Sequence, residues 1–300
     1  MQWLLPVFIC AFLYQKFFKN TSFSFSDFIN QLQDISIKWY FLLLISSAIN
    51  WRLETYKWQL LIKKFNPLRL KKALASVLSG VAVSQLLPYK TGEYLGRLVY
   101  ISNRNKWNAG LLSVVGSYSQ LLITLLFGII GFVWIKPIDY ATHFILSFSF
   151  LILLAFLFYW FLPQYRFTKK YLITAKLQLA ISLTTKMQLL KILGISALRY
   201  LSFLLPYSLL AWHLELSSGA SIGFHMCAVS CIFFIQTFAP NFILTDIALR
   251  LTIPLVVFTL SGHLPTQGNE YLPGMLVYIF NVALPMLIGT IIIIFAKLKN

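Results

Sequence analysis

Two short polar stretches inside a very apolar chain hold the residues best suited to chemistry. The first, 88–97, reads PYKTGEYLGR, and the second, 240–250, reads PNFILTDIALR. Each has a proline, then an acid, and an arginine four positions after the acid: Pro88, Glu93 and Arg97 in the first, Pro240, Asp246 and Arg250 in the second. Acid and arginine at this spacing share one face of a helix. We therefore predict one ion pair in each stretch.

The surroundings of both stretches are apolar enough to lie in a membrane. Ionisable side chains are costly there and usually serve a function. Matching interruptions of apolar segments in two halves of a chain are typical of substrate sites in transporter-like proteins. The alternative is that both stretches are ordinary loop turns with solvated charges, and the apolar flanks on each side argue against it.

Six ionisable residues fall within the predicted membrane slab, with four positive and two negative charges: Lys90, Glu93, Arg97, Arg199, Asp246 and Arg250. Two Arg–carboxylate pairs would leave Lys90 and Arg199 without a protein partner. Surplus cations suit an anionic headgroup, because arginine grips phosphate as a fork. We therefore interpret all six as substrate-binding residues. The alternative is that the pairs only hold the structure together.

Composition defines the class of protein. The chain is 59% hydrophobic, 17% aromatic and 11% charged, which is far from the usual composition of soluble domains. Apolar runs of spanning length recur from end to end, so we predict an all-α, polytopic membrane protein with a single integral domain, 1–300. The net charge of +17 does not indicate nucleic-acid binding, because Lys and Arg collect in short loops between apolar runs.

The apolar runs predict about eight membrane segments. Six are predicted full spans: Gln2–Phe18, Ile37–Trp51, Ala109–Ile135, Ala141–Leu162, Ile192–His213 and Leu272–Ala296. The span Ile37–Trp51 is expected to continue as helix to Ile62. Two further segments, 73–101 and 221–260, are predicted to be re-entrant hairpins with Pro88, Gly92 and Pro240 at their tips. The two opposed hairpins would form an inverted repeat. Hairpin arms that each cross the membrane completely would place the loops on the same sides.

Loop charges orient these segments. Segment 52–72 holds seven Lys or Arg residues and one acid, Glu54, and segment 164–191 holds six and none. The linkers near Asp139, Glu215 and Glu270 are nearly free of basic residues. The positive-inside rule therefore places both basic segments and both termini in the cytoplasm. We predict that 164–191 is amphipathic and lies on the inner leaflet.

Motifs of soluble enzymes are missing from the sequence. There is no Walker loop, and the histidines show no ligand spacing. Cys227 and Cys231 share a helix face near His225, and we interpret them as packing residues and not as metal ligands. We expect no cofactor and no metal, and the sequence favours a protein that is not an enzyme.

The order of the polar elements resembles a known family. Asn50-Trp-Arg52 is followed by Leu-Pro…Gly-Glu…Gly-Arg in 87–97 and by Pro…acid…Arg in 240–250. This pattern resembles the transmembrane region of lysylphosphatidylglycerol synthases, which in the two-domain synthases is associated with flipping of the aminoacylated lipid. The chain ends at Asn300 without the soluble transferase domain, so the resemblance does not imply synthase activity. Segments 117–120 and 241–245 depart from the family pattern, so the resemblance does not identify the substrate.

Together these features predict a protein of the bacterial inner membrane. We expect it to bind an anionic lipid or polyprenyl-phosphate headgroup in a cavity and to move it between leaflets. The first alternative is an intramembrane enzyme that acts on a lipid-linked phosphate or sugar. The second is a membrane scaffold that does not catalyse a reaction. The expected partner is an anionic membrane lipid, with a second copy or another membrane protein as further partners.

Overall fold

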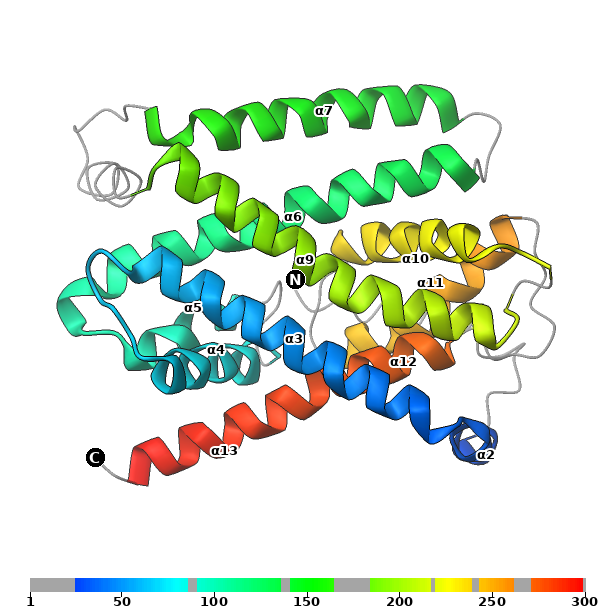
Figure 1. The fold of residues 1–300 in the computed structure, drawn as a ribbon, viewed down its shortest axis with the longest axis horizontal. Helices are drawn as coiled ribbons and strands as arrows, with labels where there is room; N and C mark the ends of the chain where they lie inside the picture. Colours follow the sequence, from blue (N-terminus) through cyan, green and yellow to red (C-terminus); the bar gives the residue numbers. More distant parts are fainter. Residues whose placement is uncertain are drawn as a thin grey trace, which may run out of the picture.

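Two long helices, α3 (Ile37–Ile62) and α9 (Lys186–His213), pack against each other through the middle of the computed structural model (Figure 1). The structure describes residues 25–85, 91–135, 141–164, 184–216, 219–238, 243–261 and 271–298. Every regular element within these ranges is a helix. The fold is therefore all-α, as predicted.

The remaining helices surround this central pair. In chain order they are α2 (Phe25–Asp34), α4 (Leu70–Ser84), α5 (Gly92–Arg97), α6 (Lys106–Ile135), α7 (Ala141–Phe161), α10 (Ile222–Thr237), α11 (Ile243–Leu260), α12 (Leu272–Tyr278) and α13 (Leu284–Leu298). Short 3₁₀ turns follow α5 and α7 and precede α6: η3 (Leu98–Tyr100), η5 (Leu162–Gln164) and η4 (Asn103–Asn105). A π-helical turn, η6 (Ile279–Ala283), joins α12 to α13.

Four helices in the described part of the chain are long and apolar enough to cross a membrane: Asn103–Ile135, Leu146–Gln164, Lys186–His213 and Leu272–Phe295. They coincide with four of the six predicted spans. The predicted span Ile37–Trp51 forms the first part of α3, which continues to Ile62 as expected. The predicted span Gln2–Phe18 lies outside the described residues, as does most of segment 164–191. The protein is a polytopic helical membrane protein.

Helix α7 presents apolar side chains around most of its circumference. Leu146 and Phe150 expose about three fifths of their surface, at 62% and 60%. A helix that is apolar all round and packed on one side is stable only where its other side meets an apolar solvent. Lipid is that solvent, so the exposed face of α7 marks the perimeter of the membrane domain.

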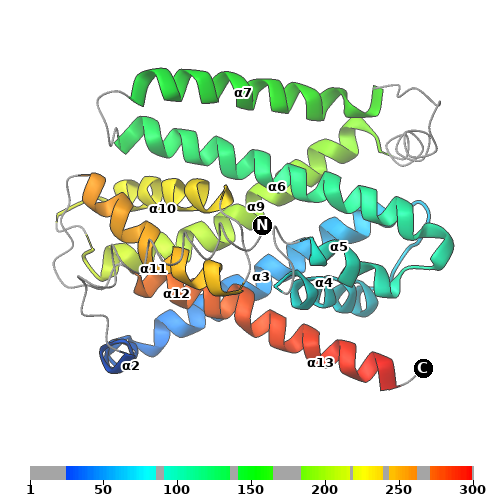
Figure 2. The same ribbon diagram turned by 180° about the vertical axis from the view of Figure 1, so that it is seen from behind.

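Apart from α2 and α7, the helices form two similar sets, each made of a long helix, a helical hairpin and a closing helix. The first set is α3, the α4–α5 hairpin and α6; the second is α9, the α10–α11 hairpin and α12–α13. The sets exchange contacts, because α4 packs on α13 whereas α10 packs on α6 (Figure 2). The two hairpins enter the bundle from opposite ends (Figure 1).

Glycines allow the two helices of the first hairpin to pack with their backbones in direct contact. A Cβ on Gly92 would overlap the carbonyl group of Val83, and a Cβ on Gly96 would overlap that of Ser79. The exchanged contacts use the same device, since Gly289 of α13 lies against the carbonyl of Leu78 in α4. Close approach of helices through small residues is the usual basis of helix association in membranes.

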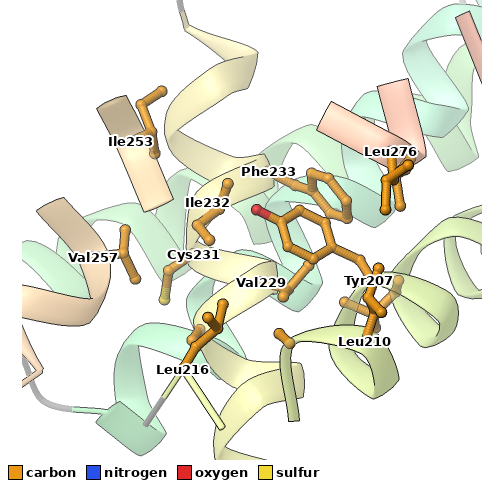
Figure 3. Packing of buried hydrophobic residues seen from close by; sticks show 14 of the residues in the cluster. Tyr207, Leu210, Leu216, Val229, Cys231, Ile232, Phe233, Ile253, Val257 and Leu276 are labelled. Carbon is orange, nitrogen blue, oxygen red and sulfur yellow. The ribbon is translucent and has the colours of Figure 1, made fainter. Parts of the chain in front are cut away.

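The apolar core has two main clusters, and each contains residues of both sets. Around α10, the side chains of Tyr207, Phe233 and Ile232 pack with residues of α11 and α12 such as Val257 and Leu276 (Figure 3). A second cluster gathers around the buried ring of Trp58 in α3, with contributions from α4, α6 and α9.

Candidate functional site

A cavity of about 420 Å³ opens between the two hairpins. Side chains from α3, α4, α5, α6, α9, α10, α11, α12 and η6 line it. Its charged lining residues are Glu54, Lys57, Glu93, Arg199, Asp246 and Arg250. The volume lies within the usual range for a small-ligand site. Both sets of helices therefore contribute charges to one cavity.

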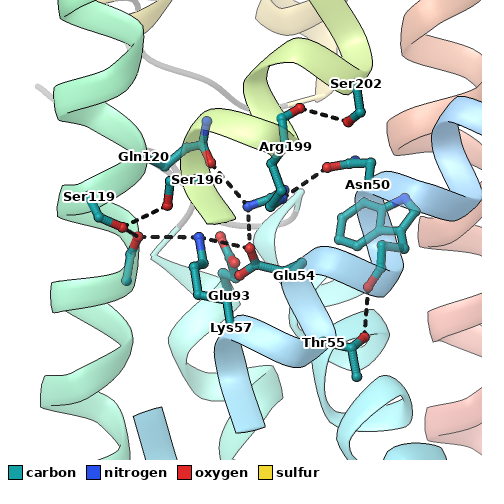
Figure 4. Close-up of polar contacts among 12 residues, drawn as sticks. Asn50, Glu54, Thr55, Lys57, Glu93, Ser119, Gln120, Ser196, Arg199 and Ser202 are labelled. Atoms are coloured by element: carbon teal, nitrogen blue, oxygen red, sulfur yellow. Dashed lines mark hydrogen bonds and ion pairs between the residues drawn. The ribbon is translucent and has the colours of Figure 1, made fainter. Parts of the chain in front are cut away.

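Glu54 of α3 lies at the centre of the charged network (Figure 4). Its side chain is 4% exposed and pairs with Lys57 at 2.8 Å, with Arg97 at 2.5 Å and with Arg199. Lys57 lies one turn further along α3 and also donates to the carbonyl of Gly116 in α6 at 3.3 Å. One carboxylate thus joins α3 to the first hairpin and to α9.

Arg97 is held from several sides. It pairs with Glu93 one turn earlier on α5 as well as with Glu54, and its guanidinium carbon lies 5.3 Å from the centre of the Trp58 ring. Gly80 of α4 makes room for it, because a Cβ there would lie 2.9 Å from Arg97 Cγ. Arg97 is consequently buried behind the cavity lining, whereas the side chain of Glu93 keeps 24% of its surface exposed.

The second hairpin carries a simpler pair. Arg250 Nη2 lies 3.3 Å from Asp246 Oδ1, and both side chains are at most 10% exposed. The Arg250 guanidinium carbon lies 4.8 Å from the centre of the Tyr278 ring, which follows from α12 packing against α11. Cation–π contact and ion pairing together hold this arginine at the wall of the cavity.

Carboxamides surround Arg199. Its Nε donates to Asn50 Oδ1 at 2.9 Å, and its Nη1 donates to Gln120 Oε1 at 3.4 Å (Figure 4). Asn50 Nδ2 in turn donates to Asn281 Oδ1 at 3.1 Å. The π-helical turn η6 carries Asn281, and the Phe280 carbonyl beside it accepts a 2.7 Å hydrogen bond from Ser47. The turn therefore brings an amide of the second set to α3.

Comparison with known proteins gives one match. Residues 3–261 match the family described as the lysylphosphatidylglycerol synthase TM region. The chain belongs to this family. No curated protein and no solved structure matches the chain. The match covers both hairpins, Glu54 and Arg199, whereas Tyr278 and Asn281 follow its end.

The structure brings together four of the residues that the sequence analysis of this family member singled out. Glu93, Arg199, Asp246 and Arg250 line one cavity, and Arg97 lies immediately behind it. Both predicted ion pairs are present. Gly92 is the first residue of α5. Lys90, Pro88 and Pro240 lie outside the described residues.

One expectation about these residues is wrong. Arg199 was expected to lack a protein partner, yet it pairs with Glu54. The prediction counted Glu54 and Lys57 among the charges of the basic segment 52–72, which was assigned to the cytoplasm. Both residues instead lie on the buried face of α3, at 3% and 1% exposure.

Several polar residues of the cavity were missed by the sequence analysis. They are Asn50, Glu54, Lys57, Gln120, Tyr278 and Asn281. A signal existed for three of them, since Asn50, Glu54 and Lys57 recur at helical spacing and Glu54 is the one acid among seven basic residues. Asn281 gave no such signal, because its position depends on a π-helical turn.

Proposed function

We propose that this membrane protein binds the headgroup of an anionic phospholipid or polyprenyl phosphate in the central cavity and moves it between the leaflets. The observation that carries the proposal is the cavity itself, which both hairpins enter and which charged side chains from both sets line. Charged groups at such depth are kept for a ligand or an ion pathway more often than for stability alone. Membership in a family of lipid-synthase membrane regions agrees with a lipid as the ligand.

The balance of charge favours an anion. The buried network has four cations, Lys57, Arg97, Arg199 and Arg250, against the three acids Glu54, Glu93 and Asp246. One phosphodiester would neutralise the remaining positive charge. A charge that the protein leaves uncompensated in a region of low dielectric constant attracts a counter-ion of opposite sign.

We propose that the hairpins are re-entrant. The second arm of the first hairpin has six α-helical and three 3₁₀-helical residues, a length of roughly 15 Å. The hydrocarbon core is about 30 Å thick. An arm of this length reaches about halfway across the bilayer, so the α4–α5 hairpin enters and leaves on the same side. Opposed hairpins of this kind give a headgroup a path from either leaflet to one site.

The orientation follows from exposed charges. Exposed basic residues gather at the end of the bundle where α3 ends and α4 and α9 begin: Lys63, Lys64, Arg69, Lys71, Lys72 and Lys191. We propose that this end faces the cytoplasm of a bacterial cell and that both chain termini lie on that side. The opposite end, with α2 and Glu215, would face outward.

Reconstitution of the purified protein tests the proposal. Vesicles of phosphatidylcholine that contain fluorescent phosphatidylglycerol should exchange this lipid between leaflets faster with the protein than without it. Arg250→Gln should slow the exchange about tenfold or more, because it removes a charge-assisted contact. Arg104→Gln, at an exposed position, is the matched control and should move lipid like the parent protein.

Three other results would replace the proposal. Equal exchange in vesicles with and without the protein would refute translocation. Conversion of an added lipid in detergent, detected by mass spectrometry, would support the enzyme alternative, because chemistry does not need a sealed bilayer. Absence of both activities, with no lipid retained on purification, would support a scaffold.

A further inference from the structure

Several buried N–H groups around the cavity lack a hydrogen-bond acceptor. They are Trp51 Nε1, Gln120 Nε2, Asn281 Nδ2 and Arg250 Nε. All four residues line the cavity. Buried polar groups in native proteins are almost always paired, so each unpaired one requires an explanation. Unpaired donors on residues of three separate helices and a π-helical turn, all lining one cavity, point to an acceptor-rich ligand.

The unpaired Nε of Arg250 belongs to a guanidinium group that already pairs with an acid. Asp246 Oδ2 is also unpaired, and it belongs to the carboxylate that Arg250 already contacts. A small rotation would join Nε and Oδ2 into a two-pronged ion pair. The other three donors, Trp51 Nε1, Gln120 Nε2 and Asn281 Nδ2, cannot pair among themselves. An indole N–H and two amide NH₂ groups do not accept hydrogen bonds from one another.

Arg199 explains why these amides present their NH₂ groups. A guanidinium group has donors only, so a carboxamide beside it must turn its oxygen toward it. Gln120 does so directly, which leaves its Nε2 without an acceptor in the protein. Asn50 also gives its oxygen to Arg199, so its nitrogen faces Asn281, and Asn281 must then accept. The Nδ2 of Asn281 is left unpaired as a result.

We propose that Arg199 is a positioning residue that fixes the orientation of two carboxamides, so that Gln120, Asn281 and Trp51 form a seat made only of N–H donors for the phosphate group of the ligand. The seat deepens the proposed function and rests on it. Trp51 belongs to the same group, because its ring lies 5.9 Å from the Arg199 guanidinium carbon. The non-bridging oxygens of a phosphodiester are acceptors without hydrogens, and they match such a seat.

Arg199 itself is largely occupied with other partners. It pairs with Glu54, and its other side-chain hydrogen bonds go to Asn50 and Gln120. Its charge is therefore compensated by a neighbouring acid, and its effect on the ligand passes through Gln120 and Asn281. A lysine at position 199 would keep the charge for Glu54, but an ammonium lacks the planar fork that holds two amide oxygens in fixed directions.

Ligand-dependent thermal stabilisation of the full chain in detergent tests the seat. The probes are dioctanoyl-phosphatidylglycerol, dioctanoylglycerol, which has the same chains without phosphate, and inorganic phosphate. We expect phosphatidylglycerol to raise the Tm of the parent protein and dioctanoylglycerol to leave it unchanged. Gln120→Met, Trp51→Phe and Asn281→Leu should each weaken phosphatidylglycerol binding about tenfold or more.

Matched controls separate the seat from general packing effects. Gln188→Met removes an amide that bonds the Leu60 carbonyl at 2.7 Å at the cytoplasmic end of the bundle, and it should bind like the parent protein. Arg199→Lys should weaken binding as much as Gln120→Met. In the Arg199→Lys background, Gln120→Met should have little further effect, because the amide is then no longer held. If Arg199 acted only through its charge, Arg199→Lys would bind phosphatidylglycerol like the parent protein.

Some results would refute the proposed phosphate seat and leave the proposed lipid transport in place. Normal phosphatidylglycerol affinity in Gln120→Met and Trp51→Phe refutes it even if the vesicles move lipid. Equal binding of dioctanoylglycerol refutes phosphate recognition. Conversely, if only inorganic phosphate binds and the same variants weaken its binding, the seat stands as a site for free phosphate and the lipid proposal fails.

Discussion

At the residue scale, the decisive feature is one carboxylate shared by three cations. Glu54 contacts Lys57 on its own helix, Arg97 on the first hairpin and Arg199 on α9. Removing charges from water is costly, and only mutual contacts offset that cost inside the bundle. Glu54 therefore determines whether two arginines can stay buried, and with them the polar lining of the cavity.

We predict that Glu54→Gln destabilises the protein strongly. Three cations would share an environment of low dielectric constant, and Arg199 would keep only amide oxygens as neighbours. Loss of one partner from a buried charge network costs about 3–5 kcal/mol. The thermal unfolding midpoint in detergent should fall clearly below that of the parent protein, and the variant should be recovered in lower amounts from membranes.

Glu93→Gln provides the comparison for this prediction. Glu93 is 24% exposed, and Arg97 keeps Glu54 as a partner after the substitution. Its unfolding midpoint should therefore fall much less. Equal midpoints for both variants would mean that Glu54 has no special role in holding the network together.

The sequence predicted only the short-range part of this network. Glu93–Arg97 and Asp246–Arg250 could be paired because helical spacing places both members on one face. Glu54 and Arg199 are 145 positions apart in the chain, and no periodicity connects them. Their contact depends on the packing of α3 on α9, which is a property of the tertiary fold.

At the scale of elements, the first hairpin depends on backbone contact between α4 and α5. The Cα of Gly96 faces the carbonyl group of Ser79, and that of Gly92 faces Val83. A backbone carbonyl cannot rotate away as a flexible side chain can. The close contact also sets the position of Glu93 and Arg97, because α5 is only six residues long.

We predict that Gly96→Ala separates the arms of this hairpin. The added methyl group overlaps backbone atoms of α4, and an overpacked contact costs about 1–3 kcal/mol. Thermal unfolding in detergent should show a lower midpoint, and lipid exchange in vesicles should slow because Arg97 shifts with α5.

Gly110→Ala and Gly194→Ala are the controls, since a Cβ at either position meets no atom within 4 Å. They replace a helical glycine by a better helix former, so their midpoints should equal or exceed that of the parent protein. If these midpoints fell as far as that of Gly96→Ala, overlap with α4 would not explain the lower stability of Gly96→Ala.

The elements themselves were largely readable from apolar runs, with two exceptions. The sequence predicted that α3 continues to Ile62, but the charges of this second half were interpreted as part of a cytoplasmic basic segment, whereas Glu54 and Lys57 are buried in the bundle. The π-helical turn at 279–283 gave no local signal, since IFNVA is as apolar as the helices on either side. Both exceptions lie at the cavity, where local sequence preference gives way to the placement of polar groups.

At the scale of the whole molecule, the two sets of helices complete each other. The first hairpin packs on α13 and the second on α6, so neither hairpin is held by its own set alone. The cavity, whose lining comes from both sets, therefore depends on the packing of each set against the other.

The orientation of this assembly is the remaining prediction. In a background in which Cys10, Cys227 and Cys231 are replaced by serine or alanine, single cysteines at Lys71 and Gly219 report on the two ends of the bundle. A thiol reagent that does not cross membranes should label Gly219→Cys in intact cells. It should label Lys71→Cys only after the membrane is permeabilised, because the positive-inside rule assigns the exposed basic cluster at 63–72 to the cytoplasmic side.

Labelling of Lys71→Cys and Gly219→Cys in permeabilised cells shows that both of these cysteines are reactive. A cysteine at Leu153 checks that the reagent stays out of the bilayer. Leu153 is 55% exposed on α7, so in a membrane it faces lipid and should remain unlabelled in intact and permeabilised cells alike. Reaction of Lys71→Cys in intact cells would reverse the orientation of the hairpins and of the path to the cavity. Reaction at Leu153 would instead mean that water reaches the face of α7 that we assign to lipid.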